Sequence, residues 1–186
     1  MRLYYSPGAC SLAVRIVIHE LGLKCHYERV DLKTKLTEKG ADFFKINPKG
    51  AVPALQLESG EIITENPVTQ QYLLDAHPNY RILPPVGNMK RYRILEWLNF
   101  VSMDLHRSCS PLFNPKISDG LKETIFRPAL KTKLLIVNAH LAGNIFLLGD
   151  DFTLPDAYLF VVLRWLPKLG FDFSELPHLK KNFLMR

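Results

Sequence analysis

The amino-acid sequence predicts a protein of two domains, a mixed α/β domain followed by an all-helical domain. In the first ~80 residues, short apolar runs alternate with amphipathic stretches in a strand–helix–strand order. Residues 78–87 contain three prolines and interrupt this alternation, and the patterns beyond them repeat at helical spacing. We therefore expect an α/β domain over residues 1–77, a linker over residues 78–87 and an all-helical domain over residues 88–186.

The first domain has the pattern of a βαβ unit followed by a β-hairpin and a second helix. The first helix is expected over Ser11–Leu21, with apolar residues on one face and Gly22 as its stop. Asn66 suits an N-cap and Pro67 the first helical position, which predicts a helix from Pro67 to Ala76. The predicted strands are Arg2–Tyr5, Lys24–Asp31, Ala54–Leu57 and Ile62–Ile63, and a loop or short helix is expected over Lys33–Gly40.

The second domain is expected to pack long helices around one apolar helix. Residues 154–165 are apolar nearly all round, which indicates the domain core. Thr153 and Asp156 have the spacing of a capping box at the start of that helix. The other predicted helices are residues 88–108, residues 119–141, which Pro128 should kink or divide, and a last helix from Leu176.

Composition and charge limit the classes of function. The net charge of the 186 residues is +6, but the basic residues are scattered, so we expect a solvated basic surface and no nucleic-acid partner. The three cysteines are far apart in sequence, which favours a reducing compartment and a cytoplasmic protein. Neither a signal peptide nor a run of ~20 apolar residues occurs, so no membrane partner is expected. No Cys or His pair has the spacing of a metal site, and no metal is expected.

Cys10 is the first candidate for chemistry, because it lies between a predicted strand and the predicted helix that begins at Ser11. Backbone N–H groups and the helix dipole at such a position favour an anion, so they stabilise a thiolate. The alternative is a small buried residue that fills the strand–helix junction. The local sequence leaves both interpretations open. Cys25 and Cys109 are expected to be packing residues.

Two further features of the first domain are consistent with a ligand site. A proline that follows Val52 just before a strand is often cis, and it then turns the backbone of Val52 outward toward a peptide-like ligand. An ordinary edge proline is the alternative. Glu65 and Asn66 precede the second helix, where free N–H groups can hold a carboxylate and Glu65 can hold an ammonium group. Plain helix capping is the alternative there.

In the second domain, Asn99, Met103 and His106 are spaced to share one helix face, with Arg107 beside them. Such a face is either solvated or one wall of a polar cleft. Phe113 is a candidate for a hydrophobic pocket, with loop packing as the alternative. Trp165 is a second candidate, although tryptophans are more often core anchors.

Taken together, these residues resemble the glutathione S-transferase family, most closely its bacterial beta class. The resemblance covers essentially the whole chain. The segments that carry it are Leu3–Leu12, Ile46–Gly50 with Val52-Pro53, Thr64-Glu65, Glu96–Phe100 and Thr153–Phe160. It implies a thioredoxin-like N-terminal domain, an all-helical C-terminal domain and a homodimer.

The resemblance also implies site residues. Carried over by position, the glutathione-binding residues are Cys10, Lys35, Val52, Glu65, Asn66, Asn99, Met103, His106 and Arg107. Cys10 and His106 would act in catalysis, with Cys10 close to the glutathione sulfur, and Phe113 and Trp165 would contact a hydrophobic substrate. Asn66 stands where the family usually has Ser or Gly, and its amide is expected to donate to the γ-glutamyl carboxylate in place of a hydroxyl.

The expected function is that of a glutathione transferase with a role in detoxification. The reaction would be conjugation of glutathione to small hydrophobic electrophiles, glutathione-dependent thiol–disulfide exchange through Cys10, or both. The alternative is a non-catalytic protein of the same fold that binds glutathione or hydrophobic ligands.

Overall fold

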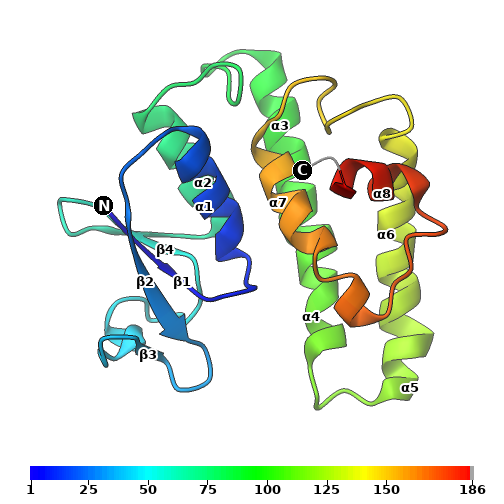
Figure 1. The fold of residues 1–186 in the computed structure, drawn as a ribbon, viewed down its shortest axis with the longest axis horizontal. Helices are drawn as coiled ribbons and strands as arrows, with labels where there is room; N and C mark the ends of the chain where they lie inside the picture. The colour runs from blue at the N-terminus through cyan, green and yellow to red at the C-terminus, as the bar shows by residue number, and fades with distance from the viewer. Residues whose placement is uncertain (185–186) are drawn as a thin grey trace. The chain divides into compact units, whose positions relative to one another are not determined.

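The computed structural model describes residues 1–184 and contains two compact units, Met1–Leu83 and Pro84–Arg186. The division between them falls inside the proline-containing segment 78–87. The first unit is built on a β-sheet and the second is helical (Figure 1). Each unit buries its own apolar core, which includes Leu3 and Leu55 in the first and Leu98 and Leu159 in the second.

The sheet of the first unit is mixed, with the strand order β3-β2-β1-β4-β5. Its strands are β1 (Arg2–Tyr5), β2 (His26–Asp31), β3 (Leu36–Thr37), β4 (Ala54–Gln56) and β5 (Ile62–Thr64). The central strand β1 is parallel to β2 and antiparallel to β4, and Leu3 lies opposite both Tyr27 and Leu55. Parallel neighbours need a crossover connection, which α1 (Ser11–Glu20) supplies. The predicted βαβ unit is therefore present.

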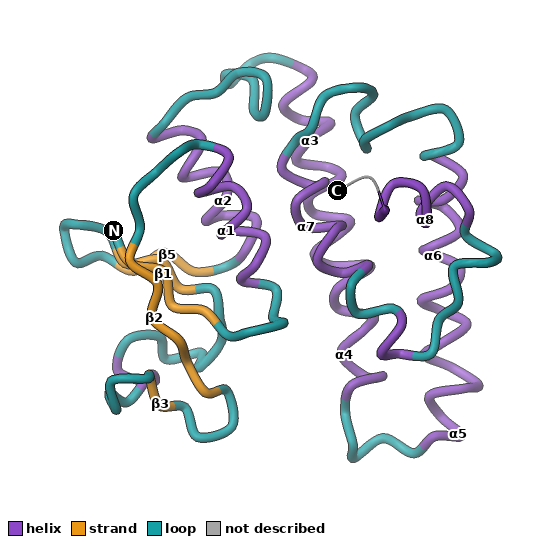
Figure 2. Tube along the Cα trace, in the orientation of Figure 1, coloured by secondary structure: helices purple, strands orange, loops and turns teal. Residues whose placement is uncertain are grey.

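Two helices of the first unit, α1 and α2 (Asn66–Ala76), pack against each other, as Figure 2 shows. The inner face of α1 buries Ala13, Val14, Val17 and Ile18 completely. This contact matters for the site, because it places the N-terminus of α2 beside the turn that leads into α1.

The short strand β3 lies in a segment that was expected to be a loop or short helix. Leu36 and Thr37 pair with Asp31 and Val30 of β2, so β3 forms one edge of the sheet. The ladder partners come from elsewhere in the sheet, so the polar sequence of this segment does not reveal them.

The second unit begins with a helical stretch that is longer than the predicted one over residues 88–108. It consists of α3 (Met89–Phe100), the π-helical segment η2 (Val101–His106) and α4 (Arg107–Phe113). The other elements are α5 (Asp119–Leu121), the π-helical η3 (Lys122–Phe126), α6 (Arg127–His140), α7 (Leu154–Leu163), the 3-10 turn η4 (Pro167–Leu169) and α8 (Pro177–Leu184). Pro128 lies in the first turn of α6, just after the helix changes from π to α geometry, and the helical stretch from Asp119 to His140 is not divided there.

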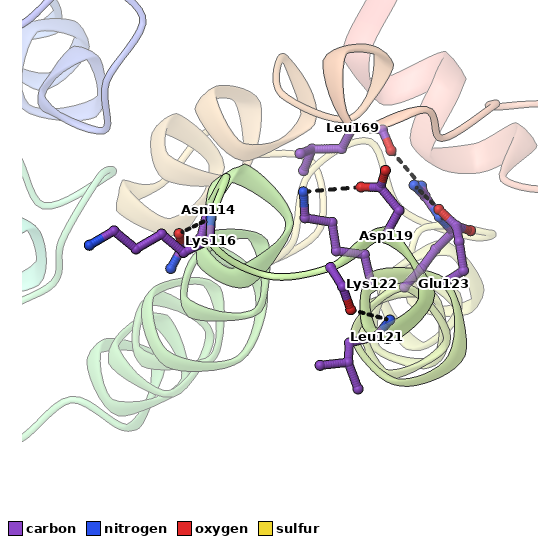
Figure 3. A network of polar contacts seen from close by, with 9 residues as sticks. Asn114, Lys116, Asp119, Leu121, Lys122, Glu123 and Leu169 are labelled. Carbon is purple, nitrogen blue, oxygen red and sulfur yellow. Dashed lines mark hydrogen bonds and ion pairs between the residues drawn. The ribbon is translucent and has the colours of Figure 1, made fainter.

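A polar network stabilises the connection from α4 to α6 (Figure 3). The Arg127 guanidinium makes two hydrogen bonds to the Glu123 carboxylate, at 2.7 and 2.8 Å, and a third to the Leu169 carbonyl. It also lies over the Phe171 ring. Arg127 thereby links the start of α6 to η4, the turn that follows Trp165.

No helix within residues 1–184 is long and apolar enough to cross a membrane.

The capping box at the start of α7 is confirmed, and it extends beyond the helix end. Asp156 is fully buried and accepts hydrogen bonds from the backbone N–H and the hydroxyl of Thr153, at 2.9 and 2.8 Å. Its other oxygen accepts from the backbone N–H of Leu147 at 2.9 Å. One carboxylate therefore satisfies donors of both α7 and the loop before it.

We expect Asp156→Ala to lower the free energy of unfolding by about 3 kcal/mol, because it leaves buried donors of Thr153 and Leu147 without an acceptor. Urea unfolding followed by circular dichroism measures this loss. Asp150→Ala, at an exposed position of the preceding loop, is the matched control and should change stability by less than about 0.5 kcal/mol. Equal stability of the two variants would contradict the assigned role of Asp156.

Candidate functional site

Cys10 ends the turn between β1 and α1 and is the N-cap residue of α1. The turn is closed by a hydrogen bond from the Ala9 N–H to the Ser6 carbonyl at 3.1 Å. Gly8 has a φ of 75°, a left-handed conformation that favours glycine. The Ser11 hydroxyl bonds both backbone polar groups of Ser6, at 3.3 and 3.4 Å. Local contacts therefore fix the backbone that presents the Cys10 thiol.

The Cys10 sulfur contacts a segment far away in sequence. Its Sγ donates to the carbonyl oxygen of Val52 at 3.3 Å. The Val52-Pro53 peptide bond is cis, as the sequence pattern favoured. The thiol is half-buried, and the Val52 side chain is buried. The first unit thus brings together two of the residues that the sequence singled out, Cys10 and Val52.

The protonation state of Cys10 bears on the two interpretations that the sequence leaves open. Burial raises the pKa of the Cys10 thiol to about 11, although hydrogen bonds from Asn66 and from the backbone at the helix start act in the opposite direction. Of the two interpretations that the sequence leaves open, the stabilised thiolate does not hold for the chain without a ligand. Loss of hydration outweighs the helix start, and Cys10 is a neutral hydrogen-bond donor at pH 7.

Asn66 also lies close to Cys10, but its amide has a different partner from the expected one. Asn66 is 4% exposed, and its Nδ2 donates to the carbonyl oxygen of Cys10 at 2.7 Å. Its Oδ1 accepts from Gln70 Nε2 at 2.8 Å. Both ends of the amide are therefore engaged inside the unit, and the expected donation from this side chain to a carboxylate ligand is not supported. The backbone N–H of Asn66 remains at the N-terminus of α2.

Glu65 is held in a conformation that is uncommon for a residue with a side chain, with a φ of 69°. Its carboxylate is exposed and accepts from Lys49 Nζ at 2.6 Å. Lys49 also donates to the Thr64 hydroxyl at 3.2 Å. Exposed ion pairs of this kind contribute little to stability, so a ligand can replace one partner at small cost. Lys35, with a φ of 60°, donates instead to the Gly50 carbonyl at 2.8 Å.

In the second unit, His106 lies in an aromatic cluster. Its Nδ1 is 2.5 Å from the Tyr158 hydroxyl, and its ring centroid is 4.9 Å from that of Trp165. The Phe113 ring meets Trp165 edge to face at 5.9 Å. Burial, together with the positive charge of Arg107, lowers the pKa of His106 to about 4. His106 is therefore neutral at pH 7, and one of its ring nitrogens is a hydrogen-bond acceptor.

Asn99, Met103 and His106, which were expected to share one helix face, differ in their exposure to solvent. Asn99, Met103 and Arg107 are exposed, whereas His106 is partly buried in the aromatic cluster. Val101–His106 is a π-helical segment, which has more residues per turn than an α-helix, so α-helical spacing describes this face only approximately. The second unit brings together His106, Phe113 and Trp165, and it leaves Asn99 and Met103 at the surface.

Comparison with known proteins agrees with these features. Residues 8–76 match the model of the glutathione S-transferase N-terminal domain, and residues 111–184 match that of the C-terminal domain. Glutathione S-transferase GstA of Escherichia coli O157:H7 is 42% identical over 179 residues, which cover 96% of this chain and 89% of the relative. This chain belongs to the glutathione S-transferase family.

Solved structures extend the comparison to the class. A ternary complex of BphK, a bacterial glutathione S-transferase, is 44% identical with a TM-score of 0.95 and covers 100% of this chain and 92% of that one. A bacterial beta-class glutathione S-transferase of Sphingomonas chungbukensis is 39% identical with a TM-score of 0.94, at the same coverage of the two chains. The predicted fold, a thioredoxin-like domain followed by a helical domain, is confirmed, and so is the likeness to the beta class. Glutathione transferase activity is supported over the non-catalytic alternative.

Sequence reasoning missed three residues that this member of the glutathione S-transferase family uses around its candidate site. Lys49 lies in the segment Ile46–Gly50 but was given no role of its own, and it pairs with Glu65. Gln70 and Tyr158 are buried residues of helices. Gln70 contacts Asn66 one turn earlier in α2, and Tyr158 of α7 contacts His106 of η2. Gln70 follows Asn66 by four residues, and this spacing was the one available signal.

Within residues 1–184, the structure contains no group of three His, Cys, Asp or Glu residues that could hold a metal ion.

The lowered pKa of His106 predicts a pH dependence of folding stability. Between about pH 6.5 and pH 4, the unfolded chain takes up a proton at this position that the folded transferase does not, so stability falls as pH falls through this window. We expect His106→Gln to lose less stability between pH 7 and pH 5 than the wild type, as measured by urea unfolding. An exposed histidine supplies the matched control, His77→Gln, which should follow the wild type. An unchanged pH dependence in His106→Gln would contradict the assignment.

Proposed function

We propose that this transferase conjugates the thiol of glutathione to small hydrophobic electrophiles and also exchanges disulfides with glutathione through Cys10. The observation that carries the proposal is the position of the Cys10 sulfur, at the start of α1 and 3.3 Å from the carbonyl of Val52. A peptide ligand that pairs with the backbone of Val52 would bring its own cysteine next to Cys10.

The first unit offers a complementary group for each end of glutathione. Glu65 would accept the α-ammonium group in place of Lys49, and the backbone N–H of Asn66 at the start of α2 would bind the γ-glutamyl carboxylate. Lys35 would supply a positive charge for a ligand carboxylate in exchange for its bond to Gly50. We assign the cysteinyl part of the ligand to the backbone of Val52.

From the second unit, we propose contacts of Asn99, Met103 and Arg107 with glutathione. Phe113 and Trp165 are proposed as the apolar surface for the electrophile, because their rings already pack together beside His106. His106, neutral at pH 7, would act by hydrogen bonding rather than by charge. We also propose a homodimer, a cytoplasmic location and a role in detoxification, in line with the three free cysteines.

The raised pKa of Cys10 gives it different roles in the two reactions. In conjugation, the glutathione thiolate attacks the electrophilic carbon, the bond to the leaving group breaks, and the thiol proton goes to solvent. A neutral Cys10 thiol can donate a hydrogen bond to that thiolate and stabilise it. In exchange, ionised Cys10 attacks oxidised glutathione, a mixed disulfide forms, and one glutathione thiolate leaves. Because burial raises the pKa of Cys10 to about 11, exchange should accelerate with pH more steeply than conjugation.

A comparison of Cys10→Ala with the wild type tests both roles. We expect the variant to lose disulfide exchange with oxidised glutathione completely, because it lacks the attacking sulfur. Conjugation with an activated aryl chloride should fall about tenfold, the effect of one lost hydrogen bond to a charged atom. Intact-mass spectrometry of the wild type should show one glutathione adduct, assigned to Cys10 by peptide mapping.

Cys25→Ala is the matched control, because Cys25 lies in the same unit and is also partly exposed. It should keep both activities and the adduct. An adduct on Cys25 or Cys109, or no adduct on the wild type, would overturn the exchange role. Full conjugation activity in Cys10→Ala would overturn the donor role.

A further inference from the structure

A chain of amide groups leads from the interior of the first unit to Cys10. Gln70 is fully buried on α2, and its Nε2 donates to Asn66 Oδ1 at 2.8 Å. Asn66 Nδ2 donates in turn to the Cys10 carbonyl at 2.7 Å. The chain crosses from α2 to the turn before α1, so it connects the two helices at the end where Cys10 lies.

The partners at the two ends fix the direction of this chain. A carbonyl oxygen can only accept, so Asn66 must present its NH₂ group to Cys10. The Asn66 oxygen then faces Gln70, which must present its own NH₂ group. The Cys10 carbonyl therefore sets which way the Asn66 amide points, and the hydrogen bond from Gln70 holds it in that orientation.

The hydrogen bond to the Cys10 carbonyl places the Asn66 amide on the residue that carries the sulfur. An amide nitrogen carries two N–H groups, and the Cys10 carbonyl needs only one of them. Burial raises the pKa of the Cys10 thiol, and the hydrogen bond from the Asn66 side chain is the largest effect that opposes it. Asn66 therefore favours the ionised form of the sulfur.

Gln70 is an unfavourable choice for packing alone. Its Oε1 is buried and has no hydrogen-bond partner among the described residues. A buried acceptor without a partner lowers stability, so an apolar side chain would suit this position on α2 better if packing were its only role. The amide nitrogen of Gln70, in contrast, has a defined partner in Asn66.

We infer that Asn66 and Gln70 are positioning residues for Cys10. Gln70 holds the Asn66 amide in its orientation, and Asn66 holds the turn that presents the Cys10 sulfur. The inference rests on the proposed function, in which the Cys10 sulfur reacts or donates, and it adds two buried residues that act through Cys10.

The test measures the reactivity of Cys10 with iodoacetamide, which requires no bound glutathione. The ionised sulfur forms a bond to carbon, the carbon–iodine bond breaks, iodide leaves, and the thiol proton goes to the buffer. The rate at the Cys10 peptide is followed by mass spectrometry from about pH 7.5 to 9.5, below the pKa of the thiol, where the rate is proportional to the thiolate fraction. A loss of the Asn66 donor should appear as a parallel shift of the whole profile.

We expect Asn66→Ala to shift the profile upward by about one pH unit, which makes alkylation about tenfold slower at each pH. Gln70→Met, which removes the orienting donor without adding charge, should shift it in the same direction. Because Gln70 acts through Asn66, the double variant should react no more slowly than Asn66→Ala alone. Asn66→Ser replaces Asn66→Ala if the latter does not fold, since a hydroxyl is too short to bridge both partners.

Gln71→Met is the matched control, because Gln71 is the next residue of α2 and its side chain donates to the Pro67 carbonyl in its own helix. Its profile should coincide with that of the wild type. Additive shifts of the two single variants, or an unshifted profile in Gln70→Met, would overturn the inference. If the shifts occur but the wild type neither conjugates nor exchanges glutathione, the proposed function fails and the positioning role stands.

Discussion

The hydrogen bond from the Asn66 amide to the Cys10 carbonyl is the contact on which the first unit's candidate site depends. It joins residues that are 56 positions apart in sequence and connects the N-terminus of α2 to the turn before α1. The contact from the Cys10 sulfur to the Val52 carbonyl adds a third segment. Local bonds among Ser6, Ala9 and Ser11 shape the turn, but only these two long-range bonds determine what the thiol faces.

Burial and hydrogen bonding act on Cys10 in opposite directions, and burial dominates. The helix start and the Asn66 amide both favour an anion, yet the pKa of the thiol is raised to about 11. In a site of this kind the sulfur stays protonated and acts as a hydrogen-bond donor until a ligand or a neighbouring charge lowers its pKa. The same is true of His106, whose pKa is lowered by burial and by Arg107, so that both candidate catalytic groups are neutral at pH 7.

The sequence was sufficient for features that depend on local patterns. The order of strands and helices, the Thr153–Asp156 capping box and the position of Cys10 at a helix start follow from spacing and residue type. The pKa of Cys10 and the partners of Asn66 could not be predicted in the same way, because both depend on which atoms the fold packs around them. Lys49 and Glu65 are 16 positions apart, and β3 is defined by its backbone pairing with β2 and not by its own residue types, so neither was predicted.

The burial of the Asn66 side chain changes how a γ-glutamyl group would be recognised. With the amide engaged by Cys10 and Gln70, the start of α2 can offer a carboxylate only backbone N–H groups, which are fixed in place by the helix. Recognition of the adjacent ammonium group then rests on Glu65, whose carboxylate is exposed and paired with Lys49. In the proposed function, binding of glutathione would displace that lysine, so its affinity would depend on an exchange of one ammonium group for another, while the buried amides would act on the sulfur.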